Sequence, residues 1–549
     1  MKTLFLVAGL ASALPALAQS VVSPGALQQL RIDEEERRRQ LERMEQQRAV
    51  EPKPVAPVAR PAAKADAAAV RFMVREIRFT RSDIFSADEL KAFARDYEGR
   101  EQSLADLQRM VAAINEAYAQ RGVVTAQAVI PPQNVAGGVV EIRLVEGHLG
   151  RIRLDGNDTT SASYITARIG MQPGDLIDLP GLESDLLRFN RTNDVQLKAE
   201  LLPGQDFATT DLKLDAEEPP HHMLRTFVDN GGSRGTGEMR AGATYMNRSL
   251  LGFRDDLSLS TTQSDGQQSY SFNYGLPINR WGGRLSIGYN QDYTQIRHGR
   301  FSTLDITGES TSTVLSLRQP LHVSPASQFD LVAGARSRRT DNWISSVFLN
   351  KVKTQDLSLG GEAQLIDAGG AWMANYTYTR GDAQITEGND YWYGRGWLRR
   401  QQRLPGDWSL IGSVSFQHTN KAQLPSSEQF IIGGEGTVRG YPVGTYSGEN
   451  GYTASAELHH PLAKFVLGSD TAVGMTGFFF ADYGSVRPYR PPNSTLRSYE
   501  DLTSVGWGVN AALGKNLSAK VTLAYAPDKL QDPMRSRFST LFQIVGTFF

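Results

Sequence analysis

Apolar and polar residues alternate through the second half of the chain, from residue 221 to the C-terminus. Stretches of about ten residues follow this period of two, and Gly, Asp, Asn, Ser and Pro separate them. In residues 408–416 the even positions form an apolar face, while Ser409, Ser413 and Ser415 occupy the other face. Such alternation is typical of strands with one face in lipid and one in a polar interior. Residues 218–549 therefore predict an all-β transmembrane barrel of roughly 16 antiparallel strands.

Tryptophan occurs only in this segment, at positions 281, 343, 372, 392, 397, 408 and 507. Indole side chains prefer the membrane interface, and outer-membrane barrels arrange them in girdles. The chain also ends on an aromatic residue, Phe549. A soluble β-sandwich is the alternative interpretation of the alternation, and the tryptophan distribution favours the barrel over it.

Residues 1–18 have the three parts of a secretory signal peptide. Lys2 supplies the positive charge, residues 4–14 the apolar segment, and residues 16–18 the small-residue cleavage site. The apolar run is shorter than the roughly 20 residues that a spanning helix needs. No later segment reaches that length, so we expect any membrane domain to be a barrel.

A charged helix is predicted within residues 19–48. From residue 31 to residue 48 six arginines and six acidic residues cancel in charge. Representative charged positions are Arg31, Glu34, Arg38, Glu42 and Glu45. Because a helix that is polar all round cannot lie in a hydrophobic core, it is either solvated or lodged in a wet, charged lumen. Both interpretations stay open, and residues 49–70 follow as a linker rich in Pro and Ala.

Residues 71–217 predict two small α+β domains with one repeated order of elements: strand, helix, helix, strand, strand. The first domain, residues 71–146, opens with a strand near residues 73–79. Ser86 and Glu89 form a capping box for its first helix, and a second helix follows Ser103. The order recurs in residues 147–217. Sheets of this kind have edges to which an extended peptide can add as a further strand.

A glycine-rich stretch carries one arginine, Arg439, in residues 433–441. Residues 477–484 then read as a strand with Phe480, Asp482 and Gly484 on one face and an apolar, lipid-compatible opposite face. Arg439 could supply the partner that Asp482 needs, in a bidentate pair. The alternative is a surface arginine and a strand-end aspartate that never meet.

The overall composition narrows the function classes. The formal net charge is −1 and the pI about 6.7, so nothing indicates nucleic acid or another polyanion as a partner. The chain has no cysteine, which excludes disulfides and thiolate metal sites. No P-loop motif occurs to support ATP-driven pumping. We expect no cofactor, no metal site and no enzyme activity.

Two patterns typical of catalytic or metal sites are weak here. Residues 231–235 fit the G-x-S-x-G pattern, but that motif needs a strand-to-helix turn, whereas a hairpin is expected between two barrel strands. The adjacent pairs His221–His222 and His459–His460 are expected to point to opposite faces of a strand, which is poor geometry for a metal.

These features together resemble the two-partner secretion transporters, the TpsB family that exports haemolysins and filamentous haemagglutinin. The resemblance covers the whole mature chain, and the repeated α+β units look like POTRA domains. Parts of the first unit, in residues 118–124, 130–133 and 145–147, look like that family's first POTRA domain. The motif Val438-Arg439-Gly440-Tyr441 matches the tip of the family's sixth extracellular loop, which folds back into the barrel. The residues Phe480, Asp482 and Gly484 match its F-x-D-x-G strand motif.

The resemblance implies that Arg439 meets Asp482 inside a 16-stranded barrel and that the N-terminal helix plugs the lumen. It implies an outer-membrane pore that recognises an unfolded partner exoprotein through periplasmic POTRA domains and exports it without ATP. The implied partner is a large β-helical haemolysin, adhesin or toxin. We expect outer-membrane lipid around the barrel and a monomeric transporter.

Two other functions share parts of this architecture. An assembly or insertion factor for outer-membrane proteins has the same POTRA-plus-barrel plan, but such factors usually carry more POTRA units than the two that fit in residues 71–217. A passive diffusion porin would need neither POTRA domains nor a tethered helix.

Overall fold

The computed structural model describes residues 23–48 and 70–549, apart from short gaps at 122, 124–125, 136, 207–208, 300, 385–387, 469–470, 491–497, 529 and 531–535. The predicted signal peptide and nearly all of the predicted linker lie outside the described residues. The chain divides into two compact units. One unit combines the N-terminal helix with residues 220–549, and the other ends at residue 219.

Sixteen antiparallel strands close into a barrel, which confirms the predicted fold class. Its strands are β9 (His222–Asp229), β10 (Arg240–Asn247), β11 (Asp256–Gln263), β12 (Gln267–Pro277), β13 (Arg284–Gln295), β14 (Ile306–Val323), β15 (Ser327–Ile344), β16 (Val347–Asp367), β17 (Gly370–Gln384), β18 (Gly388–Arg403), β19 (Ser409–His418), β22 (Asn450–Leu467), β23 (Thr471–Arg487), β24 (Glu500–Leu513), β25 (Leu517–Tyr525) and β26 (Phe538–Phe548). Each strand pairs with its neighbour in sequence, and β26 pairs with β9 to close the ring.

The two faces of the wall follow the predicted period of two. Leu285, Ile287 and Tyr289 on β13 are each exposed on the outer surface, as are Leu410 and Val414 on β19. An isolated strand would gain nothing from this pattern. In a closed barrel the alternation places apolar side chains in lipid and polar ones in the lumen.

One tryptophan departs from the expected interfacial girdle. Trp281, Trp372 and Trp507 expose 40–50% of their surface on the outside of the wall. Trp397 instead lies opposite Asn375 on β17, faces the lumen, and packs, like Leu41 of the N-terminal helix, against Ala371 and Met373. Its strand position places it on the inner face, so this one indole contacts protein rather than the membrane interface.

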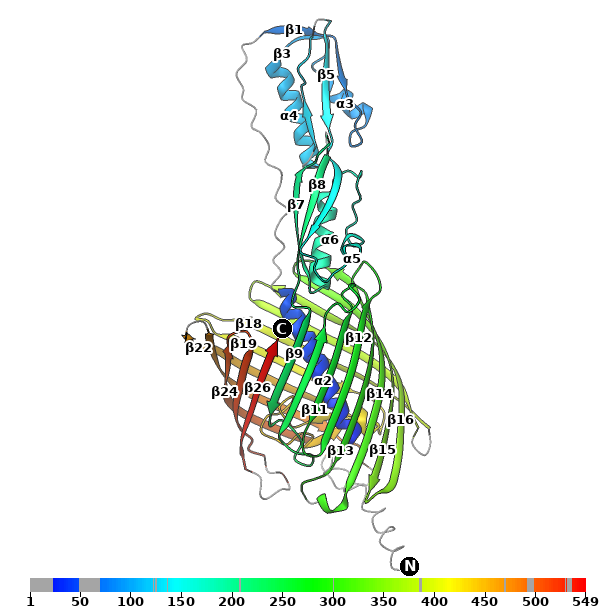
Figure 1. The fold of residues 1–549 in the computed structure, drawn as a ribbon, viewed down its shortest axis with the longest axis vertical. Helices are drawn as coiled ribbons and strands as arrows, with labels where there is room; N and C mark the ends of the chain where they lie inside the picture. Colours follow the sequence, from blue (N-terminus) through cyan, green and yellow to red (C-terminus); the bar gives the residue numbers. More distant parts are fainter. Residues whose placement is uncertain are drawn as a thin grey trace, which may run out of the picture. The chain divides into compact units, whose positions relative to one another are not determined.

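Helix α2 (Pro24–Arg48) runs inside the barrel, where Figure 1 shows it in dark blue behind the strands β9 to β14. Of the two interpretations of the charged helix, the lumen is therefore the correct one. No helix among the described residues is long and apolar enough to cross a bilayer.

The segment between β19 and β22 folds back into the barrel. It contains a one-turn helix η2 (Ser426–Glu428) and a short hairpin of β20 (Phe430–Ile432) and β21 (Tyr446–Gly448). We call residues 419–449 the inner loop. A second short helix, η1 (Ser302–Leu304), lies between β13 and β14.

The other unit repeats one sheet twice. The first sheet has the order β2–β5–β4 and the second the order β6–β8–β7, and in each the first strand is parallel to the central strand. The elements are β1 (Arg71–Val74), β2 (Glu76–Phe79), α3 (Ala87–Ala94), β3 (Arg100–Ser103), α4 (Leu104–Gln120), β4 (Gln127–Val129), β5 (Val139–Val145), β6 (His148–Asp155), α5 (Ala162–Thr166), α6 (Leu179–Thr192), β7 (Gln196–Pro203) and β8 (Thr209–Glu217). The strand–helix–helix–strand–strand order is observed in the second domain, and in the first domain the short strand β3 is added between the two helices.

The predicted first strand is split in two. Arg75 belongs to neither part, and its backbone N–H donates to the Gly138 carbonyl at 2.6 Å. On one side of Arg75, β1 pairs with β3, a strand that alternation alone did not reveal; on the other, β2 pairs with β5. A strand changes its pairing partner because of tertiary contacts, which the local alternation of residues does not show.

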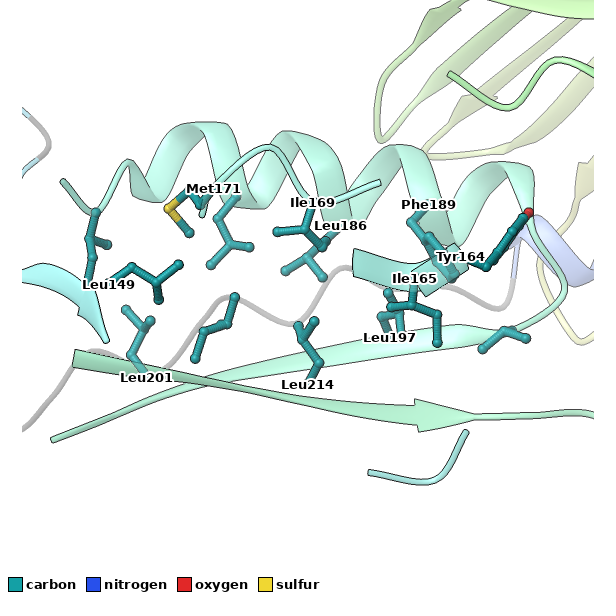
Figure 2. Close-up of a cluster of buried hydrophobic side chains, with 14 residues drawn as sticks. Leu149, Tyr164, Ile165, Ile169, Met171, Leu186, Phe189, Leu197, Leu201 and Leu214 are labelled. Atoms are coloured by element: carbon teal, nitrogen blue, oxygen red, sulfur yellow. The ribbon is translucent and has the colours of Figure 1, made fainter. Parts of the chain in front are cut away.

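Each domain of this unit has its own apolar core. In the second domain the side chains of α6, including Leu186 and Phe189, point onto the sheet against Leu197 and Leu214, as Figure 2 shows. In the first domain the buried Tyr118 hydroxyl donates to the Glu146 carboxylate at 2.8 Å. Burial and this carboxylate raise the pKa of the Tyr118 phenol, so the phenol stays protonated and keeps donating.

Candidate functional site

Arg439, at the tip of the inner loop, is buried in the lumen against β22 and β23. Its Nε and Nη2 donate to the two carboxylate oxygens of Asp482, each at 2.7 Å. Its Nη1 donates to Glu457 at 2.5 Å, and its Nη2 also donates to the Ser455 hydroxyl at 3.1 Å. The guanidinium lies 3.7 Å from the centroid of the Phe480 ring. Such a bidentate, charge-assisted pair fixes both the position and the orientation of the loop tip.

Apolar packing surrounds this ion pair. Val438 and Tyr441 belong to a buried cluster with Phe430, Ile432 and other apolar residues of the inner loop and wall. Gly484 makes room for it, because a Cβ there would lie 2.8 Å from a Val438 methyl group. Gly440 has φ +87°, which favours glycine, and a Cβ there would lie 3.0 Å from Ala524. The two motifs singled out in the sequence, residues 438–441 of the loop and Phe480, Asp482 and Gly484 of the wall, therefore contact one another. We call this contact region the loop seat.

Glycines on β24 complete the seat, and the sequence did not single them out. A Cβ on Gly506 would lie 2.6 Å from the Phe480 ring, and one on Gly508 would lie 2.4 Å from the Phe478 ring. Each ring thus packs directly against the backbone of β24, at a position where only the hydrogen of a glycine fits. A glycine two residues from another in a barrel strand was the signal available.

The N-terminal half of helix α2 contacts β13 and β14 closely. Arg31 donates to both oxygens of Asp292, at 3.1 and 3.0 Å, and Gln28 donates to the same carboxylate at 2.7 Å. Gln28 also exchanges hydrogen bonds with Ser310, as donor to its carbonyl and acceptor from its hydroxyl. At Gly308 a Cβ would lie 2.1 Å from the Pro24 ring, so this approach of helix and wall requires glycine.

A second group of contacts joins the helix, the wall and the inner loop. The Gln29 side-chain oxygen accepts from Arg336, at 2.6 Å, and from Arg338, both on β15. The same two arginines pair with Glu428 of η2, at 2.7 and 2.9 Å. Glu428 is fully buried, and sequence analysis missed it because an isolated loop carboxylate follows no periodicity.

Farther along the helix the contacts are sparser and wetter. Glu42 accepts from Arg225 at 2.7 Å and is 3.8 Å from Arg38, with both side chains of the latter pair more than a third exposed. Glu34 and Arg38 line a cavity of about 750 Å³ between the helix and the wall. The side chain of Glu45 lies outside the described residues. The lumen is therefore occupied by the helix without being filled.

The weak catalytic and metal signals have structural explanations. Residues 231–235 lie in the hairpin between β9 and β10, as expected. His459 and His460 point apart, toward Glu457 and Trp408 respectively. The expectation was wrong for His221 and His222, whose ring centroids lie 4.4 Å apart. His221 precedes β9, so its side chain does not follow the alternation of faces that holds within the strand.

Comparison with known proteins decides the family. The family described as haemolysin secretion/activation protein ShlB/FhaC/HecB matches residues 208–511, more than half of the chain. The chain belongs to this family. A ShlB-type POTRA domain matches residues 72–147. The protein is accordingly an outer-membrane transporter of two-partner secretion, with its POTRA domains in the periplasm.

Individual relatives are similar over most of their length. The heme/hemopexin transporter protein HuxB of Haemophilus influenzae (strain 86-028NP) is 25% identical over 80% of each chain. The outer membrane transporter CdiB of Dickeya dadantii (strain 3937) is 25% identical over 83% of this chain and 82% of its own. The solved structure of CdiB from Escherichia coli superposes with a TM-score of 0.66 at 19% identity, covering 96% of this chain and all of that one. This transporter of the ShlB/FhaC/HecB family therefore shares their fold.

Proposed function

We propose that the protein exports one unfolded, β-rich exoprotein through its barrel. In this proposal helix α2 is a removable plug, and the inner loop stays in place inside the lumen. The observation that carries the proposal is the pair of attachments inside the barrel. Arg439 and Asp482 hold the loop in a dry, apolar seat, whereas α2 is held by polar contacts beside a water-accessible cavity. A helix with charged and polar contacts can leave a wet lumen without exposing apolar surface.

Relatives support the nature of the cargo. One relative is named as a heme/hemopexin transporter and another as a haemolysin transporter. By analogy we propose a large β-helical haemolysin, adhesin or toxin as the partner of this chain, carried by a monomeric transporter in outer-membrane lipid. Folding of the exoprotein outside the cell would bias its movement through the pore, in place of ATP.

The two POTRA sheets offer the docking edges. The first sheet ends in β2 and β4 and the second in β6 and β7. We propose that the exoprotein adds to such an edge as an extended strand, because main-chain hydrogen bonds bind an unfolded chain without requiring one sequence. The proposed domains are residues 71–146 and 147–217, with residues 19–48 as the plug and 49–70 as its tether.

A secretion assay tests the export function. The full-length transporter is expressed with the exoprotein of the adjacent reading frame, and the exoprotein is measured outside the cells. Secretion that depends on the transporter is the expected result, and equal secretion without it would refute the proposal. Assembly of other outer-membrane proteins is measured in the same cells, since a defect there would instead favour the insertion-factor function.

Deleting residues 20–48 tests the plug. Single-channel conductance in planar bilayers should rise, because an unplugged barrel of this size encloses an aqueous channel. Unchanged conductance of the inserted variant would show that α2 does not close the pore.

A further inference from the structure

The outer face of β14, β15 and β16 changes from apolar to polar at one level. Strand register places Leu315, Ala335 and Leu357 side by side in one outward row. Leu357 and Leu315 expose 68% and 46% of their surface, as lipid-facing residues do. The next outward row consists of Thr313, Ser337 and Gln355. This step marks where the hydrocarbon layer ends on this side of the barrel.

This step from apolar to polar residues lies on the extracellular side of the barrel. Because β9 follows directly from the periplasmic POTRA unit, the rim where β9 begins is periplasmic. Strands alternate in direction, so the turn between β15 and β16, at residues 345–346, is at the opposite rim. The rows above Leu357 therefore point into the headgroup layer of the outer leaflet.

Cations gather in this layer. Arg339 on β15 lies directly opposite Lys353 on β16, one row above Ser337 and Gln355. Like charges in directly opposed positions repel each other, and an anion bound between them would reduce that repulsion. Asp341 offsets part of the charge, at 2.7 Å from Arg339 and 3.7 Å from Lys351. Within the described residues, no carboxylate is within ion-pair distance of the Lys353 ammonium.

A hollow lies beside the cations. Its volume is about 340 Å³, and residues of β15, β16 and β17 line it, among them Arg339, Lys353 and Asp382. Arg380 on β17 lies opposite Leu357, at the edge of the apolar zone. We call Arg339, Lys351, Lys353 and Arg380 the headgroup patch. Its four cations outnumber the three outward carboxylates at this level of β14 to β17, Asp341, Asp382 and Glu309, the last of which lies opposite Asp341.

We propose that the headgroup patch binds the phosphorylated headgroup of an outer-leaflet lipid, with the acyl chains of that lipid on Leu357 and Leu359. Phosphate oxygens accept hydrogen bonds from guanidinium and ammonium groups, and Arg339 and Lys353 present one of each at opposed positions beside the hollow. A phosphate there relieves the repulsion between these two cations. The exposed leucines directly below, at 68% and 57%, supply the matching apolar surface.

Native mass spectrometry of the full-length transporter in detergent tests the site, with diphosphorylated lipid A as the probe. Wild type should retain bound lipid A, and the variant Arg339→Gln/Lys353→Gln should bind it about tenfold more weakly, since each cation near such a surface contributes appreciably. Monophosphorylated lipid A should bind between these limits. Heat-modifiable migration on gels verifies that each barrel is folded.

The matched control is Arg280→Gln/Lys515→Gln, which removes an exposed arginine and lysine from turns at the periplasmic rim. It should bind lipid A like wild type. Equal loss in both variants, or no loss in the Arg339/Lys353 variant, would overturn the proposal. So would full competition by millimolar inorganic phosphate, which would assign the site to a free anion, or equal binding of phosphatidylglycerol, which would show no selectivity for this headgroup.

Discussion

The inner loop and helix α2 both occupy the lumen, but they are attached in different ways. Arg439 of the loop has a 5% exposed side chain and contacts a 1% exposed Asp482, within an apolar cluster. Helix α2 is attached by a buried ion pair, Arg31 to Asp292, and by more open ones, Asp33 to Arg395 and Glu42 to Arg225. Removing water strengthens an ion pair only when every polar group stays satisfied. At the loop tip the Arg439 guanidinium and the Asp482 carboxylate meet that condition, and in the first turns of the helix Arg31 and Asp292 do.

This difference indicates that the inner loop stays in the lumen permanently, whereas helix α2 can leave it. An uncompensated charge left behind in a dry seat is costly, whereas charges in a wet lumen are rehydrated when the helix leaves. Loop and helix also share Arg336 and Arg338, which contact both Glu428 and Gln29. When α2 departs, Glu428 still satisfies these arginines, so the loop need not move with the helix.

The largest effect is expected at the loop seat. Arg439→Ala leaves Asp482 buried without its partner, which typically costs about 3–5 kcal/mol. The loop should leave its seat and secretion should fall to background while the barrel still inserts. Arg439→Lys is the matched control, because it keeps the charge and loses the bidentate geometry, and it should retain partial secretion. Wild-type secretion by Arg439→Ala would remove the distinction between loop and helix.

A smaller steric change tests the apolar part of the same seat. Gly484→Ala forces a methyl group against Val438, and overpacking of this kind costs about 1–3 kcal/mol. The thermal unfolding midpoint and secretion should both decrease. Gly474→Ala on the same strand is the control, since a Cβ there has nothing within 4 Å. Equal behaviour of the two variants would mean that the packing around Val438 does not hold the loop.

A single charge change should weaken the attachment of helix α2 to the barrel wall. Asp292→Asn weakens the hydrogen bonds from Arg31 and Gln28, and hydrogen bonds to charged groups contribute about 1.5–3 kcal/mol. The ratio of open to plugged channels should rise about tenfold in bilayer recordings. Arg38→Gln, which alters an exposed pair beside the cavity, should change that ratio little. A reversed order of the two variants would place the main attachment in the second half of the helix.

Salt should produce the smallest effect. Raising ionic strength from about 0.1 M to 1 M shortens the screening length from about 10 Å to about 3 Å. The open pairs of α2 should weaken, giving a few-fold more open channels, while the unfolding midpoint of the barrel stays constant. A fall in that midpoint as large as that of Gly484→Ala would show that the loop seat is as accessible to salt as the helix.

Sequence reasoning was strongest where one element repeats a local pattern. Period two in the strands predicted the barrel, and the face shared by Phe480, Asp482 and Gly484 is the buried face observed. It was weaker for the helix, where charged positions such as Glu34 and Arg38 proved to face the cavity. The close contacts to the wall come from Arg31 and from the neutral residues Gln28 and Gln29, which the sequence did not single out. Which side of a uniformly polar helix meets the wall depends on its rotation in the lumen, and no residue type signals that rotation.

The linear pattern of residues was enough to establish a strand-built membrane domain, two repeated α+β domains and a charged helix, because periodicity is a property of neighbouring residues. The partners inside the lumen were decided by barrel closure. Arg31 and Asp292 are separated by 261 positions, and Gln29 and Arg338 by 309. Such pairs come together only when sixteen strands have adopted one register around one ring, and that register sets the height and the face of every inward side chain.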